Sequence, residues 1–432
     1  MVPFLIYPFL LFFVVNGFNR QDSLSIFIST FVLVIYFYFL ENKLEIFKNR
    51  FSIFISYQFI LRFFVLGSNP SLSDDIYRYL FDAQLLLNGF SPYGLTPNDW
   101  VIKHPEYVSE LNDLVTNMNS PDYVSVYPLL LLAVFMMGSI LNSVLHTTYL
   151  GIQIIFLIID GVNLYLVRKF YPKESFRFYW VYFANPIVLI EGLSQLHPEI
   201  LIVPWILIII HTSQVWKQGI SFLVLSQLKI NTIIFILGFS KKWRKVLLPT
   251  FVVLTVFVLW KLTVFSNLQT QTNRGIGLFF HSFRFSGIVE PFFYFPLEMI
   301  GYGYLSGFFS LSIFASIILF LIFQTSFMTL PIEKRLFLIY FLFLMFSPVI
   351  HSWYWILFVV LGMCCYISMF LQTLVVFIAM LSYLNYVSES YFYLNWVISL
   401  IGFGIYGIKE IDYLRKTTTA GECKNTISKI HW

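Results

Sequence analysis

The sequence predicts an all-α, polytopic membrane protein with about 12 transmembrane helices. Of its 432 residues, 58% are hydrophobic and only 11% are charged, whereas a typical soluble domain is about a quarter charged. Mean hydropathy is +0.78, and apolar runs of membrane-spanning length recur along the whole chain. This composition excludes a soluble multidomain enzyme and a disordered protein. No nucleic-acid partner is expected, and the lipid bilayer is the expected surroundings.

Twelve apolar runs are expected to cross the bilayer, because each is long enough and carries few charges. They are residues 3–18, 24–40, 51–67, 147–167, 178–196, 199–214, 246–264, 306–323, 336–350, 355–370, 372–387 and 391–408. Three further runs, 128–145, 219–239 and 288–303, are expected to be re-entrant or to lie along the interface. The run 219–239 has basic residues on both flanks, so it must cross an even number of times, and Lys229 is expected at the tip of this hairpin.

The distribution of basic residues predicts the orientation. Nineteen of the 27 Lys and Arg residues fall in clusters between the expected crossings or in the tail. The clusters are Lys43/Lys48/Arg50, Arg168/Lys169/Lys173/Arg177, Lys217, Lys241/Lys242/Arg244/Lys245, Lys334/Arg335 and Lys409/Arg415/Lys416/Lys424/Lys429. If all face the cytoplasm, as the positive-inside rule predicts, both termini are cytoplasmic. Residues 1–408 then form one membrane domain, and 409–432 a polar cytoplasmic tail.

One extramembrane segment, residues 68–123, is large and acidic, and this topology puts it on the non-cytoplasmic side. It holds eight Asp and Glu residues against Arg78 and Lys103. The sparse polar residues of the rest of the chain fall at the same face. Ionisable groups near hydrocarbon are costly and usually face a cavity where they function. The residues expected to gather there are Asp74, Asp75, Tyr127, Gln195, His197, Glu199, Lys229, Arg284, Glu290, His351, Trp353 and Tyr354.

Asp74 and Asp75 have two interpretations. A helix over 75–89 would put Ile76, Tyr79, Leu80 and Ala83 on one apolar side, and the two carboxylates would then be an N-cap and a first-turn residue. Helix capping explains one carboxylate, because Asp caps well. Two are more than a cap needs. A pair can bind a divalent cation through oxygen, or one can act as general base while the other orients it.

The other polar residues also leave alternatives open. Lys229 is either a snorkelling side chain or a partner for a phosphate, and its position deep within an apolar run favours the second. His351 with Trp353 and Tyr354 is either an interfacial aromatic belt or a phosphate donor group. His197 and Glu199 are metal ligands, hydroxyl binders or ordinary loop residues. Inside the bilayer, Arg62 and Asp160 are a candidate structural ion pair.

Several short motifs resemble, in the same order, those of bacterial GT-C membrane glycosyltransferases, and most resemble those of polyprenol-phosphate-mannose-dependent mannosyltransferases. The similarity covers roughly residues 60–360. Pro is missing after Pro128 and after His351, Ser286 replaces Asn, and Lys229 lacks the usual Tyr-Pro after it. The motifs are Ser73-Asp-Asp-Ile-Tyr-Arg-Tyr-Leu-Phe-Asp82, Asn88-Gly-Phe-Ser-Pro-Tyr93, Tyr127-Pro-Leu129, Asn185-Pro-Ile-Val-Leu-Ile-Glu-Gly192 with His197, Leu228-Lys229, Phe283-Arg-Phe-Ser286 and His351-Ser-Trp-Tyr354.

The resemblance implies an inverting transfer of a hexose, mannose in the commonest case, from a polyprenyl-phosphate donor to a glycan or lipid-linked acceptor. It implies a bacterial cytoplasmic membrane, with catalysis at the non-cytoplasmic face and residues 68–123 as the catalytic loop. Asp75 would be the general base, because the family's Asp-x-x-x-Tyr spacing fits Asp75 and Tyr79, and Asp74 is the other candidate. The expected phosphate-binding residues are Lys229, His351 and Arg78. The expected acceptor- or sugar-binding residues are Tyr79, Tyr127, His197, Glu199, Trp353 and Tyr354.

Two other classes of protein fit the composition. A multi-span transporter or lipid flippase would account for many crossings, but such proteins place their site near the bilayer midplane between repeats, and no repeat is visible here. A non-catalytic assembly subunit would use the acidic segment as a docking surface. No cofactor is expected beyond the divalent cation that Asp74 and Asp75 could bind. Cys364, Cys365 and Cys423 offer no disulfide framework.

Overall fold

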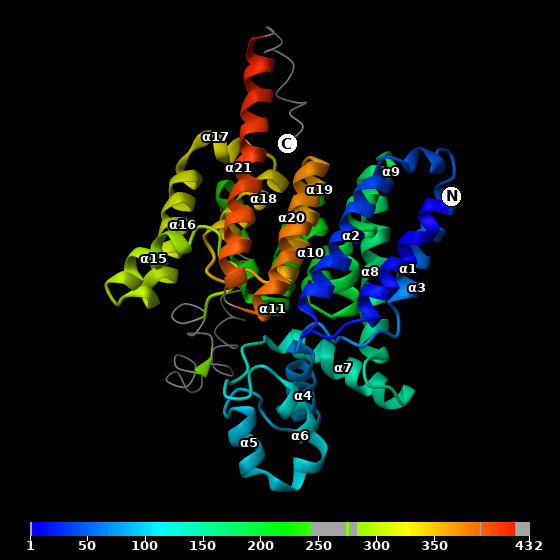
Figure 1. Cartoon of the computed structure of the whole chain (residues 1–432), viewed down its shortest axis with the longest axis vertical. Coiled ribbons are helices and arrows are strands. Elements are labelled where there is room, and N and C mark those ends of the chain that lie inside the picture. Colours follow the sequence, from blue (N-terminus) through cyan, green and yellow to red (C-terminus); the bar gives the residue numbers. More distant parts are fainter. Residues whose placement is uncertain (1, 243–273, 276–282, 389, 420–432) are drawn as a thin grey trace.

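The computed structural model describes residues 2–242, 274–275, 283–388 and 390–419 (Figure 1). Every named element in this part of the chain is a helix, and isolated bridges join Phe285 and Ser286 to Val349. The predicted all-α class is therefore confirmed. The expected crossing 246–264 lies outside the described residues.

The N-terminal third alternates membrane-type helices with a small acidic unit. The first helices are α1 (Val2–Asn16), α2 (Ser23–Glu41), η1 (Leu44–Phe47) and α3 (Phe51–Val65). The next four form what we call the acidic subdomain: α4 (Asp75–Leu87), α5 (Pro97–Lys103), η2 (Pro105–Tyr107) and α6 (Val108–Asn117). Figure 1 shows this subdomain projecting from one end of the long helices.

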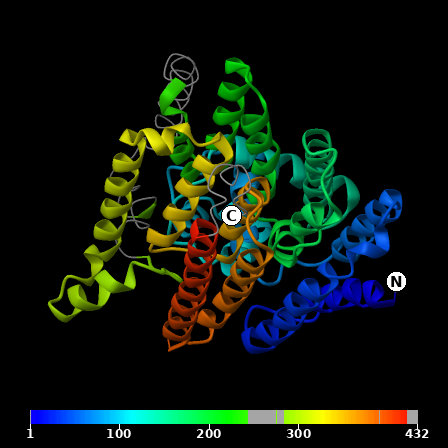
Figure 2. The ribbon, with the colours of Figure 1, turned by 90° about the horizontal axis from the view of Figure 1, so that it is seen from above.

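Most of the remaining helices contribute to one apolar core, and Figure 2 shows their arrangement from above. The middle group is α7 (Leu129–Leu145), α8 (Leu150–Phe170), α9 (Phe176–Phe183), η3 (Val188–Ser194), α10 (Glu199–His211), α11 (Val215–Leu228) and η4 (Ile230–Lys242). The last group is α15 (Pro291–Met299), η5 (Gly303–Leu305), α16 (Ser306–Phe323), α17 (Thr325–Thr329), α18 (Ile332–Phe346), η6 (Ser352–Tyr354), α19 (Trp355–Cys364), α20 (Met369–Leu381), η7 (Ser382–Tyr386) and α21 (Ser390–Thr419).

Five helical segments among the described residues are long and apolar enough to cross a membrane. The bent pair η3 and α10, which meet at 111°, adds a sixth if it counts as one span. Others, such as α1 and α3, are apolar but have only 10–17 residues, fewer than the roughly 20 of a typical crossing. The chain is therefore a helical membrane protein, and the figure of twelve crossings stays a prediction. The five segments are Ser23–Glu41, Leu150–Phe170, Gly303–Phe323, Met369–Tyr386 and Ser390–Lys409.

Contacts between distant turns define two ends of the helix bundle. At the end that we call basic, the α2–α3, α8–α9 and α19–α20 turns meet, together with the start of α1 and the second half of α21. The end of α21 lies away from the acidic subdomain in Figure 1. The clusters predicted to be cytoplasmic at 43–50 and 168–177 thus share one end. The contacts are Glu41 with Arg177, Phe4 with Phe47, Arg168 with Phe51, Glu174 with Tyr366 and Lys409 with Phe370.

At the opposite end, which we call acidic, another set of turns meets beside the acidic subdomain. The α1–α2 turn, the segment before α4, the η3–α10 turn, the α11–η4 junction and the segments before α15 and after α20 all take part. Leu196 in the η3–α10 turn has a left-handed backbone (φ 61°), which reverses the chain inside buried protein. The contacts are Arg20 with Asp74, Leu72 with Gln195, Lys229 with Glu199 and Ser286 with Asn385.

Between the two ends, the predicted ion pair of Arg62 and Asp160 is present. The Nε of Arg62 lies 2.8 Å from a carboxylate oxygen of Asp160, and both side chains are buried. Arg62 also donates to the carbonyl of Phe183. The pair thus joins α3, α8 and the end of α9 in the interior of the bundle.

Neutralising one partner of this pair is expected to destabilise the protein. Arg62→Met leaves the Asp160 carboxylate buried without its partner, which costs about 3–5 kcal/mol. The double variant Arg62→Met/Asp160→Leu removes both charges and should recover most of the loss. Thermal unfolding of the detergent-solubilised protein measures both effects. A double variant no more stable than Arg62→Met would show that the cost comes from lost packing instead.

Candidate functional site

Asp74 and Asp75 lie where α4 begins, at the junction between the helix bundle and the acidic subdomain. Asp74 occupies the N-cap position, but its side chain makes no capping hydrogen bond. It forms an ion pair with Arg20 from the α1–α2 turn instead. Asp75 is half-buried, and the side-chain amide of Asn119 donates to its Oδ1 at 3.2 Å. The two residues therefore take the predicted N-cap and first-turn positions, but the Asp74 side chain does not cap the helix.

The helical register of α4 is as the sequence predicts. Ile76, Tyr79, Leu80 and Ala83 are buried on one side, against the core of the bundle. The Tyr79 ring stacks on Phe135 of α7, with ring centroids 4.2 Å apart. This packing fixes the first turn of α4, so the position of Asp75 is set by a rigid element.

Lys229 interrupts the chain between α11 and η4. Its backbone is extended (φ −154°), so the apolar stretch 219–239 breaks at this residue, as the sequence predicts. Its ammonium group forms an ion pair with Glu199, the first residue of α10, and lies 3.9 Å from the centroid of the Tyr354 ring. Because the side chain is only 16% exposed, it does not snorkel to water.

Aromatic stacking holds the two histidines. The indole of Trp353 lies between them, with its centroid 4.3 Å from His351 at 3° and 3.7 Å from His197 at 14°. Phe285 stacks on the other side of His351 at 4.8 Å. His197 Nε2 is 3.4 Å from a carboxylate oxygen of the buried Glu191.

These groups converge into what we call the polar cluster. The Asp75 carboxylate is within electrostatic range of the Lys229 ammonium and the Tyr354 hydroxyl. Lys229 and His197 are in turn within electrostatic range of His351. Residues from five distant parts of the chain therefore share one site at the acidic end. Its charged and imidazole members are Arg20, Asp74, Asp75, His197, Glu199, Lys229 and His351.

The two neighbouring carboxyls differ in their surroundings. Burial is the largest influence on the pKa of Asp74 and raises it, the Arg20 guanidinium opposes that rise, and the charge of Asp75 adds to it. The net result is a raised pKa, so Asp74 keeps its proton to a higher pH than an exposed aspartate does.

Some predicted residues lie elsewhere or have other partners. Arg78 is buried in the acidic subdomain, where its Nε lies 3.0 Å from Asp82 and its Nη1 donates to the carbonyls of Ser120 and Tyr123. Arg78 therefore holds parts of the acidic subdomain together, and we propose no phosphate contact for it. Arg284 and Glu290 pair with each other through two hydrogen bonds, at 2.7 and 3.0 Å.

The expected sugar-binding residues are divided by exposure. Tyr79 and Trp353 are buried, and Tyr79 packs edge-on against Tyr127. Glu199 is buried and engaged by Lys229. Tyr127 and Tyr354 are partly exposed, and Asp75 is within electrostatic range of both hydroxyls. These two tyrosines are therefore the members of the set best placed to meet a ligand beside Asp75.

The structure adds residues that the sequence prediction left out of the site. Arg20 pairs with Asp74, and its guanidinium carbon lies 3.8 Å from the centroid of the Tyr386 ring. Tyr383 donates to Glu191 at 2.5 Å. A signal for Arg20 exists in the sequence, because it is a basic residue between two crossings on the side expected to lack positive charge.

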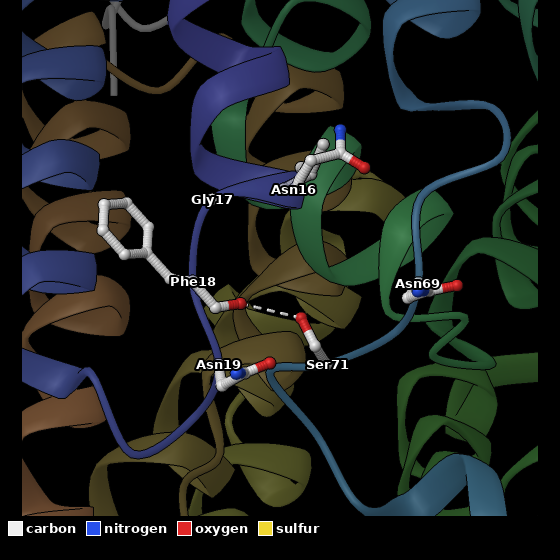
Figure 3. A pocket seen from close by; sticks show the side chains of 7 residues that line it. Asn16, Gly17, Phe18, Asn19, Asn69 and Ser71 are labelled. Carbon is white, nitrogen blue, oxygen red and sulfur yellow. Dashed lines mark hydrogen bonds between the residues drawn. The ribbon is translucent and has the colours of Figure 1, made fainter.

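A small polar cavity adjoins Arg20 (Figure 3). Its volume is about 140 Å³, and Asn16, Asn19, Asn69 and Ser71 line it. The Ser71 hydroxyl donates to the carbonyl of Phe18 at 2.9 Å, and the Ser71 carbonyl accepts from the Arg20 backbone at 3.1 Å. The cavity thus presents uncharged amide and hydroxyl groups one residue away from the polar cluster.

The described residues include no group of three or more His, Cys, Asp or Glu side chains placed to hold a metal ion. Asp74, one of the two expected cation ligands, is neutralised by Arg20. A calcium ion usually takes six to eight oxygen ligands, so Asp75 and Asp74 do not fit such a site. We therefore derive no step through a cation.

The fold and the polar cluster define a helical membrane protein with a site at one end of its bundle. No protein-family model, curated protein or solved structure matches the chain.

Proposed function

We propose that this protein transfers a hexose from a polyprenyl-phosphate donor to a hydroxyl of a glycan or lipid-linked acceptor. One observation carries the proposal: a half-buried carboxylate, Asp75, shares a site with a lysine and a histidine at the end of an apolar bundle. The motif resemblance makes mannose the first sugar to test and a bacterial cytoplasmic membrane the expected location, with the acidic end non-cytoplasmic.

Asp75 serves as the general base. Its carboxylate is partly exposed and is held by Asn119 on the side of the acidic subdomain. In the transfer, the acceptor oxygen bonds to the anomeric carbon while the bond from that carbon to the phosphate oxygen breaks. Asp75 takes the acceptor's proton, and attack from the face opposite the phosphate inverts the anomeric centre. Such positioned bases contribute about 10²–10⁴-fold to rates.

Lys229 and His351 stabilise the departing polyprenyl phosphate. Glu199 and the ring of Tyr354 fix the Lys229 ammonium, and Trp353 and Phe285 fix the His351 ring. Groups fixed in this way need no reorganisation when negative charge develops, which makes their stabilisation strong in a site of low dielectric. Glu199 also offsets the charge of Lys229 before the donor arrives.

The place of the site suits substrates of opposite character. Apolar helices lie on one side of the polar cluster, and the acidic subdomain on the other. A polyprenyl chain partitions into the first, and a hydrated acceptor approaches from the second. The neutral amides of the cavity beside Arg20 are suited to sugar hydroxyls.

Transfer from a labelled donor tests the proposal directly. The protein is reconstituted in proteoliposomes with undecaprenyl-phosphate [³H]mannose and a membrane extract as acceptor source. We expect label in a new glycan or glycolipid product. Movement of labelled donor across sealed vesicles with no covalent product would instead indicate a flippase and overturn the proposal.

Arg20 is expected to set the acid limit of this activity. The Arg20 guanidinium lowers the pKa of Asp74 against the rise caused by burial. Arg20→Gln removes that opposition, so Asp74, beside the base Asp75, should keep its proton to a higher pH. The acidic limb of the kcat/KM–pH profile should then move to higher pH, whereas in Arg20→Lys, which keeps the positive charge, it should move less. An unmoved acidic limb in Arg20→Gln would contradict this role.

A further inference from the structure

An apolar groove of about 400 Å³ lies between α2 and α20. The two helices are neighbours in both views of the ribbon (Figures 1 and 2). Their facing side chains are mostly aromatic and aliphatic. The lining residues include Phe31, Ile35 and Tyr38 from α2 and Phe370, Leu374 and Phe377 from α20. A groove of this volume and character is of the size that holds ligands.

Both helices that form the groove lead to the polar cluster. α2 begins at Ser23, three residues after Arg20, and the Ser23 hydroxyl donates to the Arg20 carbonyl at 2.8 Å. α20 continues into η7, whose last residue, Tyr386, lies under the Arg20 guanidinium. Arg20 therefore lies beyond the groove at its acidic end, and Lys409 packs on the Phe370 ring at its basic end.

A contact path joins that cation to the histidine of the site. The ring of Tyr386 lies 5.1 Å from the ring of Phe285, and Phe285 stacks on His351. Arg20 is itself within electrostatic range of His351. An anion held between Arg20 and His351 would therefore sit at the head of the α2–α20 groove.

We propose that the α2–α20 groove holds the polyprenyl chain of the donor, with the donor phosphate at the Arg20 side of the polar cluster. The inference rests on the proposed function and assigns a place to its lipid. An apolar groove with a polar, cationic site beyond its acidic end matches a ligand with a long hydrocarbon chain and a single anionic head. Arg20 then acts with Lys229 and His351 as a third positive or hydrogen-bonding group around the phosphate.

The distance between groove and cation makes the proposal specific to chain length. Phe31 lies eight residues along α2 from Ser23, or about 12 Å at the helical rise, and Tyr38 about 22 Å. The first isoprene units would therefore span the gap, and only later units would enter the groove. A short isoprenyl phosphate would bind the cations without touching the groove.

Binding of two isoprenyl phosphates of different length tests this arrangement. Undecaprenyl phosphate and geranyl phosphate are titrated against the full-length protein in nanodiscs. Ile35→Trp fills the groove. We expect it to weaken undecaprenyl phosphate binding about tenfold, the equivalent of displacing about two buried CH₂ groups. Geranyl phosphate binding should not change. Equal effects on both ligands, or no effect on either, would overturn the proposal.

Val32→Trp is the matched control. Val32 is 44% exposed on the same helix and Ile35 is 53% exposed, but Val32 does not line the groove. Both variants place an indole against lipid, so folding should be similar, and only Ile35→Trp should affect the long ligand. An equal loss of undecaprenyl phosphate binding in Val32→Trp would show that the effect does not come from the groove, and it would overturn the proposal.

The sugar-transfer assay separates this inference from the function on which it rests. Suppose that the wild type transfers sugar and that Ile35→Trp binds the long and the short ligand as well as the wild type does. That result would refute the groove as the polyprenyl site and leave the proposed function intact. A chain-length effect on binding with no sugar transfer would refute the function and leave a polyprenyl-phosphate site. Crosslinking by a photoreactive group near the middle of the chain should label α2 and α20, and labelling of other helices alone would count against the groove.

Discussion

Asp75→Asn is expected to lower the rate of sugar transfer by about 10²–10⁴-fold, because asparagine keeps the size of the side chain but cannot take the acceptor's proton. The loss should appear in kcat, and binding of undecaprenyl phosphate should change little. Initial rates in proteoliposomes measure the first effect, and equilibrium titration the second. Asp74→Asn should cost less, because the Asp74 carboxylate is engaged by Arg20.

Asp113→Asn provides the control for charge. Asp113 is exposed on α6 in the same acidic subdomain, so this variant removes one negative charge without touching the polar cluster. We expect nearly wild-type transfer from it. If Asp75→Asn also retained wild-type transfer, Asp75 would not be the base, and the proposed mechanism would fail at its first step.

Lys229→Met is expected to have two separable effects. It removes a phosphate partner, and it leaves the Glu199 carboxylate buried without its cation. The second effect costs about 3–5 kcal/mol of stability. The double variant Lys229→Met/Glu199→Leu removes both charges and should recover most of the stability, as measured by thermal unfolding.

The double variant also distinguishes a functional role for Lys229 from a structural one. Transfer should stay low in Lys229→Met/Glu199→Leu even though the fold is restored, because nothing replaces the ammonium at the departing phosphate. Recovery of transfer together with stability would mean that the Lys229–Glu199 pair is only structural. Glu199→Gln, which keeps the lysine, should retain donor binding.

Periodicity and composition were sufficient to predict much of the architecture. The apolar face of α4, the break of the chain at Lys229 and the buried pair of Arg62 and Asp160 are present as predicted. Each depends on local sequence or on the free-energy cost of placing a charge within hydrocarbon, which makes a charged residue there require a partner. The predicted meeting of distant polar residues at one end also has a local cause, because most of them fall at the end of an apolar run and Lys229 interrupts one.

The partners of those residues could not be predicted, because pairing depends on three-dimensional packing. Lys229 was expected to bind a phosphate, yet in the structure it forms an ion pair with Glu199 from a different helix. Arg78 was expected near the phosphate because it is close to Asp75 in sequence. In the structure it pairs instead with the buried carboxylate of Asp82, four residues further along α4. Helix number is also hard to predict, since several apolar helices are shorter than a full crossing.

The acidic subdomain is built almost as a separate module. Phe81, Leu85 and Trp100 belong to a small hydrophobic cluster distinct from that of the bundle, and the Arg78–Asp82 pair anchors the loop that follows α6. The opposite side of α4 packs on the bundle, and Leu114 of α6 also contacts the core of the bundle. Surface changes within this module can therefore accumulate without disturbing the helices below it. Under the proposed function, such a division would let the helix bundle keep its lipid-binding role while the acidic subdomain changed in evolution to select different acceptors.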